Sequence, residues 1–301
     1  MLLAAIVFAF AITSAHAVSG TRDQIAESFA VKAGGTLNFD SDLANVDITT
    51  SDSDTIRVEL DREFKVSTEQ ELNELRQKLT VEMAKEGDGV KVTVRFAGDR
   101  NSRERNKVRL DFRIAMPHKF NLDLRSCGSA KIGNIDGWVK ARMLGGSLRL
   151  GDVSGPVTAR TDGGSVSLGD VGGDLDAVSN GGSVAAGRTN GKVMARANGG
   201  SIAITEATDG IDAKAAGGSV AVYISKQPRS DSKLIAEAGN VELRLPESVA
   251  VNIDAACSAG RLRSEFSLPG NQDEDRLKGA INGGGPVVML RASAGNIHLR
   301  K

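Results

Sequence analysis

Acidic side chains recur at fixed intervals in the middle of this 301-residue chain and are the first candidates for chemistry. Asp152 and Asp170 stand at equivalent places in a repeated turn, and Asp176 and Asp212 share a place in a repeated strand. Converging carboxylates can act as general acid and base on a glycosidic bond. A β-helical lyase or hydrolase acting on polysaccharides is therefore one hypothesis. Turn chemistry and solvated strand faces also use Asp, and this simpler interpretation is favoured.

The remaining residues do not complete a catalytic or metal centre. His118 and His298 lie far apart in the sequence, and neither has a recognisable nucleophile beside it. Calcium-binding β-roll repeats need Gly and Asp at positions where the segment Gly163–Leu168 carries Val and Leu. We therefore predict that the protein is not an enzyme and that it uses no metal and no cofactor.

One column of cationic residues is a candidate ligand-binding stripe. Arg142, Arg160, Arg196 and Lys214 occupy the same place in successive repeats, and Val178 occupies it in the remaining one. They would project from one face of a sheet, where they could bind an anionic glycan or lipopolysaccharide. The alternative is that these charges keep the face soluble and discourage lateral stacking of sheets, and nearby aspartates would partly neutralise them.

These columns exist because the chain contains an internal repeat. The tripeptide Gly-Gly-Ser recurs at a constant spacing of eighteen residues, at 145–147, 163–165, 181–183, 199–201 and 217–219. A degenerate copy, Cys127-Gly128-Ser129, stands one spacing earlier. A fixed period near twenty residues is typical of a solenoid or stacked array.

The pattern inside one unit, Gly163–Asn180, indicates its secondary structure. Val166 and Leu168 alternate with polar residues, and so do Leu175 and Ala177. A period of two predicts strands, and the glycine-rich segments between them predict turns built on residues that tolerate positive φ. Each unit is then strand, turn, strand, turn, with a rise of about 4.8 Å per coil. We predict an all-β fold: a single-chain parallel β-solenoid with about eighteen residues per coil in the centre.

Small side chains predict that the interior of this solenoid is narrow. Ala recurs without interruption in the second strand, and residues 126–225 contain no Phe. Trp138 and Tyr223 are therefore expected outside the coils or at their corners. Cys127 and Cys257 would be separated by six or seven coils, or about 30 Å. A disulfide needs Cα atoms within about 7 Å, so we predict two free thiols.

The chain divides into four segments. Residues 1–17 are expected to be a signal peptide, because the apolar run Leu2–Ile12 precedes Ala15 and Ala17, a small-x-small cleavage pattern. A buried strand or helix is the alternative, and the run is too short to span a bilayer. Residues 18–125 form a β-rich N-terminal capping part, 126–225 the regular repeats, and 226–301 irregular coils.

The two flanking segments carry more local predictions. In the N-terminal part, a capping box at Thr68–Glu71 opens a short helix that carries Leu72, Leu75 and Leu79 at helical spacing. At the other end, Asn296–Arg300 alternates apolar with polar or cationic residues, which is typical of an exposed terminal edge strand.

The matching numbers of acidic and basic residues, 38 each, give no electrostatic reason to expect nucleic acid. With a cleaved signal and no transmembrane span after it, the protein would be exported to the periplasm, the cell envelope or the extracellular space. An envelope polysaccharide or a surface protein is the partner class that this location suggests.

Short motifs along the chain resemble a family of adhesin-like bacterial domains of unknown function, related to auto-transporter adhesin heads. The resemblance covers roughly residues 30 to 301 and is carried by the stretches Ile114–Pro117, Phe120–Leu124, the Gly-Gly-Ser-Val units, Gly283–Pro286 and Ser293–Leu299. It implies an exported parallel β-solenoid on or near the cell envelope, acting as an adhesin-like binding or structural module. No catalytic residues are attached to these motifs.

Overall fold

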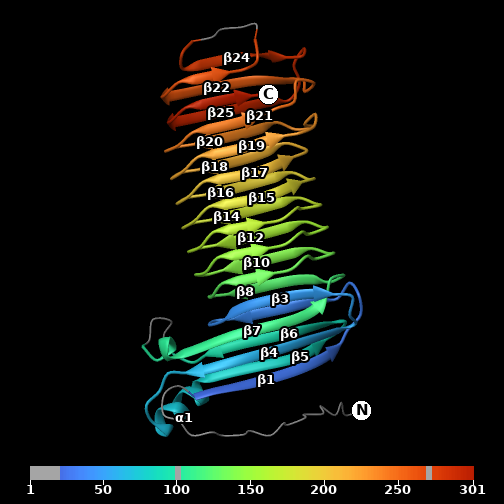
Figure 1. The fold of residues 1–301 in the computed structure, drawn as a ribbon, viewed down its shortest axis with the longest axis vertical. Coiled ribbons are helices and arrows are strands. Elements are labelled where there is room, and N and C mark those ends of the chain that lie inside the picture. The colour runs from blue at the N-terminus through green and yellow to red at the C-terminus, as the bar shows by residue number, and fades with distance from the viewer. Residues whose placement is uncertain (1–20, 99–102, 269–272) are drawn as a thin grey trace.

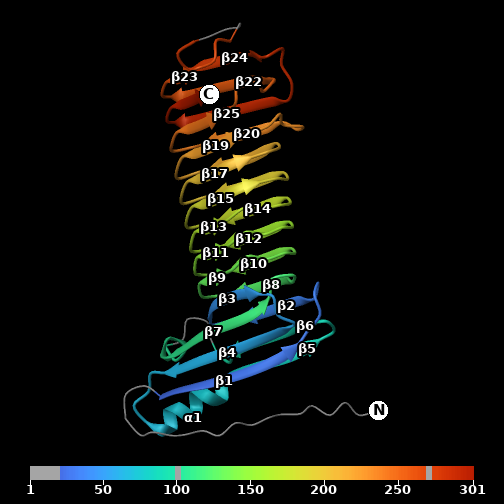
Figure 2. The same ribbon diagram turned by 45° about the vertical axis from the view of Figure 1, so that its right-hand side comes forward.

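The protein is an elongated stack of strands with two long sheets facing each other (Figures 1 and 2). The structure, a computed structural model, describes residues 21–98, 103–268 and 273–301. The expected signal peptide at 1–17 lies outside these residues. The prediction of an all-β, solenoid-like chain with long parallel sheets is confirmed.

Within the described residues, each sheet has thirteen strands. In spatial order, sheet A consists of β1 (Thr21–Ala30), β4 (Thr55–Phe64), β7 (Val108–Pro117), β3 (Asn45–Ser51), β9 (Ala130–Ile132), β11 (Leu148–Leu150), β13 (Val166–Leu168), β15 (Val184–Thr189), β17 (Ile202–Ala207), β19 (Val220–Ile224), β21 (Val241–Arg244), β26 (Ile297–Arg300) and β23 (Leu262–Ser264). Sheet B consists of β24 (Arg276–Ile281), β22 (Val251–Ala259), β25 (Val287–Ala294), β20 (Ser232–Ala236), β18 (Ile211–Ala215), β16 (Val193–Ala197), β14 (Leu175–Ser179), β12 (Val157–Thr161), β10 (Val139–Met143), β8 (Asn121–Ser126), β2 (Thr36–Ser41), β6 (Gly89–Phe96) and β5 (Leu79–Glu86).

The central coils stack in register. Val139 pairs with Val157, and Val157 with Leu175, so strands of sheet B pair with strands eighteen residues further along the chain. Leu148 pairs with Val166 in sheet A by the same step. The inward residues of both sheets are buried between them, whereas Trp138 is 36% exposed, as its expected place outside the coils requires. Each buried Val or Leu contributes roughly 1.5–3 kcal/mol.

Both ends of the stack are closed by coils that lie out of sequence order. At the C-terminal end, β25 lies between β20 and β22, and β26 lies between β21 and β23. At the N-terminal end, β2 lies between β6 and β8, and β3 between β7 and β9. The expectation that the last strand is an exposed edge is therefore wrong, because β26 has a hydrogen-bonded neighbour on each side.

The N-terminal part is wider and richer in aromatic side chains. Phe39 and Phe112 meet edge to face with ring centroids 4.9 Å apart, and both are buried. Helix α1 (Glu69–Lys78) begins at the predicted capping box, where the backbone N–H of Glu71 donates to Thr68 Oγ1 at 3.2 Å. Leu79, expected on the helix, instead begins β5, since the chain becomes extended at that residue.

The turn glycines of the repeat have a different cause from the one expected. None of them has φ in the left-handed region, and the glycines that do, such as Gly34 and Gly283, lie outside the repeats. A Cβ added at Gly163 would lie 2.2 Å from the carbonyl oxygen of Gly145 in the preceding coil. Glycine is needed at these corners because successive coils stack directly on one another.

The two cysteines are both free, as predicted. Cys257 is buried, and its burial raises the pKa of the thiol, whereas Cys127 is partly exposed at a coil corner. Among the described residues, no helix is long and apolar enough to cross a membrane.

Candidate functional site

The predicted cationic stripe lies on the outer face of sheet B. Arg142 pairs in register with Arg160, and Arg196 with Lys214, while Val178 lies between Arg160 and Arg196. The structure therefore brings the four predicted residues into one column across β10 to β18.

Carboxylates compensate most of the stripe. Arg160 pairs with Asp176 at 2.7 Å, Arg196 with Asp212 at 2.6 Å, and Lys214 with Glu237 at 2.7 Å. Arg142 makes no ion pair within the described part of the chain, and neither does Arg125, which extends the column by one strand. Arg125 precedes Arg142 by seventeen residues, so an eighteen-residue spacing does not detect it.

The aspartates considered for catalysis are bonded within the fold. Asp152 Oδ1 accepts the backbone N–H of Asp170 at 2.8 Å, and Asp170 Oδ1 accepts that of Arg188 at 2.7 Å. Asp176 and Asp212 pair with arginines of the stripe, and all four carboxylates hold neighbouring coils to one another. This is the turn and surface chemistry that the sequence favoured.

The histidines do not join them in a catalytic or metal-binding group. His118 lies beside Asp52, with Nδ1 3.2 Å from Oδ1, and His298 projects from β26 at the other end of the stack. In the described residues, no group of three or more His, Cys, Asp or Glu side chains could hold a metal ion.

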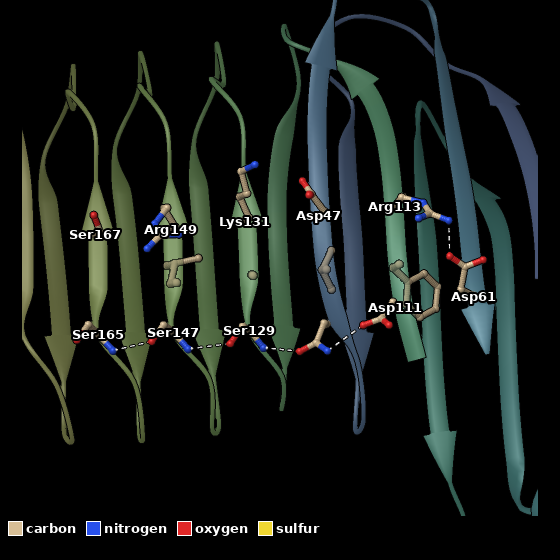
Figure 3. A pocket seen from close by; sticks show the side chains of 15 residues that line it. Asp47, Asp61, Asp111, Arg113, Ser129, Lys131, Ser147, Arg149, Ser165 and Ser167 are labelled. Atoms are coloured by element: carbon tan, nitrogen blue, oxygen red, sulfur yellow. Dashed lines mark hydrogen bonds and ion pairs between the residues drawn. The ribbon is translucent and has the colours of Figure 1, made fainter. Parts of the chain in front are cut away.

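A groove with a volume of about 720 Å³ lies on the outer face of sheet A. Figure 3 shows it at the boundary where the regular coils of β9, β11 and β13 meet the longer strands β3, β7 and β4. Backbone pairing fixes the register of the strands that form the groove. Asp47 lies opposite Lys131, Lys131 opposite Arg149, and Arg149 opposite Ser167.

The charges in the groove fall into two sets. In the first set, Arg113 pairs with Asp61, and Asp111 accepts from Asn45 Nδ2 at 2.9 Å. Arg109 also pairs with Asp111, at 2.7 Å. These groups already have partners inside the protein.

The second set, which we call the open charges, consists of Asp47, Lys131 and Arg149. Among the described residues these side chains make no hydrogen bond or ion pair, and Lys131 and Arg149 are exposed. Figure 3 shows them side by side on neighbouring strands, directed away from the interior.

A ladder of side-chain hydrogen bonds borders the open charges. Asn45 Oδ1 accepts the backbone N–H of Ser129 at 3.1 Å, Ser129 Oγ accepts that of Ser147 at 3.3 Å, and Ser147 Oγ accepts that of Ser165 at 3.1 Å. The ladder continues through Ser183 and later coils with the same geometry. It fixes one hydroxyl per coil along the lower edge of the groove in Figure 3.

Sequence reasoning missed this groove because its charges do not repeat. The column of Lys131 and Arg149 continues as Ser167, Ala185 and Ala203, so only its first two members are cationic. Asp47 belongs to the N-terminal part, where no period is visible. The usable signal was a pair of cations one period apart next to the Ser column.

Solved structures and one family model match the chain. No curated protein matches the chain. Crystal structures that match include a candidate adhesin from Parabacteroides merdae, at 10% identity over 92% of this chain and 96% of that chain with a TM-score of 0.45. A candidate adhesin from Bacteroides fragilis has 10% identity, coverage of 92% and 96% and a TM-score of 0.38. A candidate cell adhesion protein from Clostridium sporogenes has 14% identity, coverage of 92% and 99% and a TM-score of 0.25.

At these TM-scores the structural likenesses carry no argument beyond the family match. That match is to the model of the Toastrack DUF4097 family and covers residues 35–300. It agrees with the resemblance to adhesin-like domains of unknown function, while the relation to auto-transporter heads stays a prediction. The chain belongs to the Toastrack DUF4097 family.

Proposed function

We propose that the protein is an exported, adhesin-like module of the cell envelope that binds a surface ligand on the outer face of its sheets. The observation that carries this proposal is the set of open charges in the groove of sheet A. Asp61, Asp111 and Arg113 are paired within the protein, whereas the other three charged side chains that line this groove, Asp47, Lys131 and Arg149, are not. Charged groups gathered in a concavity without internal partners are suited to an external one.

The bonding of the carboxylates supports binding over catalysis. A glycoside hydrolase needs two carboxylates that are free to exchange protons with a substrate. Asp152 and Asp170 instead accept backbone N–H groups, and Asp176 and Asp212 pair with arginines. No observation in the described residues favours a polysaccharide-cleaving enzyme.

The stripe of sheet B stays a second proposed binding surface. Its open end is formed by Arg142 and Arg125, while the ion pairs of Arg160, Arg196 and Lys214 reduce the positive field along the rest. Replacing Arg160 and Arg196 together by Glu tests it. If the double variant binds every envelope fraction as the unmodified protein does, the stripe is not a binding surface.

Cell fractionation of the tagged protein, followed by binding of the purified protein to isolated envelope fractions, tests the proposed function. We expect the protein in an exported fraction and saturable binding to at least one envelope component. A protein found in the cytosol, or one that binds no envelope fraction, would contradict the proposal.

A further inference from the structure

We propose that the groove of sheet A binds the oxyanion groups of an acidic polysaccharide, carboxylate or phosphate, through Lys131 and Arg149. This inference rests on the proposed function and assigns a ligand class to the groove of sheet A. It is carried by three features of the described residues: two adjacent open cations, a row of hydroxyl donors and one open acceptor.

The two cations are placed to act together. Lys131 and Arg149 pair in register on β9 and β11, so their Cα atoms are about 4.8 Å apart. Both side chains are exposed, and neither has a carboxylate partner. The acids across the groove, Asp61 and Asp111, are held by Arg113 and Arg109. The positive charge of the pair is therefore available to an anion that enters from solvent.

The serine ladder adds neutral donors beside the cations. The hydroxyls of Ser129, Ser147 and Ser165 each accept one backbone N–H from the next coil. In the part of the chain that the structure describes, none of these hydroxyls donates a hydrogen bond. A hydroxyl has one proton to donate, so each serine can offer its O–H to a ligand oxygen. The spacing is one donor per coil, about 4.8 Å.

The remaining groups distinguish a sugar chain from other anions. Asp47, in register with Lys131, offers a carboxylate that accepts hydrogen bonds from hydroxyl groups and repels a bare polyphosphate. The one aromatic residue of the groove, Phe112, is buried, so a neutral sugar has no ring on which to stack. Cations, donors and one acceptor together fit a chain that carries both oxyanions and hydroxyls.

Two matched double variants test the assignment. The groove variant is Lys131→Glu with Arg149→Glu. The control is Lys85→Glu with Lys91→Glu, an equal change of charge on two exposed residues of β5 and β6 that lie in neither the groove nor the stripe. The probes are polygalacturonate for carboxylate, phosphomannan for phosphate, dextran as the neutral polymer and phosphatidylglycerol vesicles for an anionic lipid surface. Dissociation constants are measured at one fixed salt concentration with the full chain.

We expect polygalacturonate or phosphomannan to bind, and dextran not to bind. The groove variant should bind about tenfold or more weakly, because it loses two charge-assisted contacts, whereas the control should stay within about twofold. The affinity of the charge-neutral variant, Lys131→Gln with Arg149→Gln, should lie between those of the groove variant and the control. Circular dichroism verifies that each variant is folded. If the groove variant does not fold, the affinity of the charge-neutral variant decides the question.

Several results would overturn the assignment. These are equal affinity of the groove variant and the unmodified protein, an equal loss in the control, binding to vesicles alone, or no binding to either acidic polymer. In the last two cases, saturable binding to an envelope fraction would leave the proposed function standing. A failure of the proposed function is therefore distinguishable from a failure of the groove assignment.

Discussion

At the scale of single residues, the distance between coils decides which side chains a corner tolerates. A Cβ at Gly163 would meet the carbonyl oxygen of Gly145, and one at Gly181 would lie 2.3 Å from the carbonyl oxygen of Gly163. Each corner glycine therefore rests on the backbone of the previous coil. That backbone is a bend between the end of one paired strand and the start of the next, so it cannot move aside without shifting the strands that it connects.

Gly163→Ala should therefore destabilise the protein by about 1–3 kcal/mol, as overpacking does in a tightly packed core. Thermal and urea unfolding measure the effect. Ser167→Ala is the control, because the in-register residue of the next coil is Ala185 and the Ser167 side chain makes no hydrogen bond among the described residues. Its free energy of unfolding should change by less than about 0.5 kcal/mol. Equal stability of the two variants would show that the coils stack more loosely than described.

At the scale of elements, the loop between β19 and β20 interrupts the regular spacing. Asp212 pairs with Lys233, a step of twenty-one residues instead of eighteen. The buried carboxylate of Asp209 holds this longer loop: Oδ1 accepts the backbone N–H groups of Gly210 at 2.7 Å and Arg229 at 3.0 Å. Burial would raise the pKa of Asp209, but these hydrogen bonds and Arg229 outweigh it and lower the pKa.

Asp209→Asn should lower stability at neutral pH by roughly 1–3 kcal/mol, because it weakens hydrogen bonds to a charged group. Since folding lowers the pKa of Asp209, its contribution to stability is complete above the pKa of the unfolded state, about 3.9. This contribution is lost as the pH falls through the lower pKa that Asp209 has in the folded protein. The gap in Tm between the variant and the unmodified protein should therefore close in acid. Asp88→Asn, at a residue whose side chain is 65% exposed, is the control and should show no gap. A gap that does not change with pH would contradict this role.

The elements also show how far the sequence could predict the structure. The period of Gly-Gly-Ser and the alternation of residues such as Val166 and Leu168 indicated the strands, their parallel stacking and the narrow interior. The order of β25 and β26 was not predictable, because a local pattern does not say which neighbours a strand pairs with. The groove was missed for a related reason. Asp47 and Lys131 are far apart in sequence and are brought together by the insertion of β3 beside β9.

At the scale of the whole molecule, the central coils are interchangeable units. Deleting 163–180 removes one complete coil, and the residues on either side can stack with the original step. Deleting 163–171 removes only the sheet A strand and its turn, so two sheet B strands would follow each other with no return path. We expect the first deletion to keep the circular dichroism spectrum and a cooperative melt, since stability in stacked repeats depends on nearest neighbours. The second should abolish cooperative unfolding. If both deletions behave alike, the coil is not the structural unit.

The whole molecule thus presents two outer faces of unequal chemistry. On sheet B, carboxylates neutralise most of the cationic column, and on sheet A, Lys131 and Arg149 remain open beside a row of serine hydroxyls. The proposal of a surface-binding module depends on this difference. It predicts that binding is confined to a small part of a long molecule.

The most direct test is the ratio of dissociation constants for an acidic polysaccharide between the Lys131→Glu, Arg149→Glu variant and the Lys85→Glu, Lys91→Glu variant. Both carry the same change in net charge, so general electrostatic repulsion cancels in the ratio. A ratio of about ten or more in favour of the second variant is the result that the groove predicts. A ratio near one would show that the groove is not the binding site.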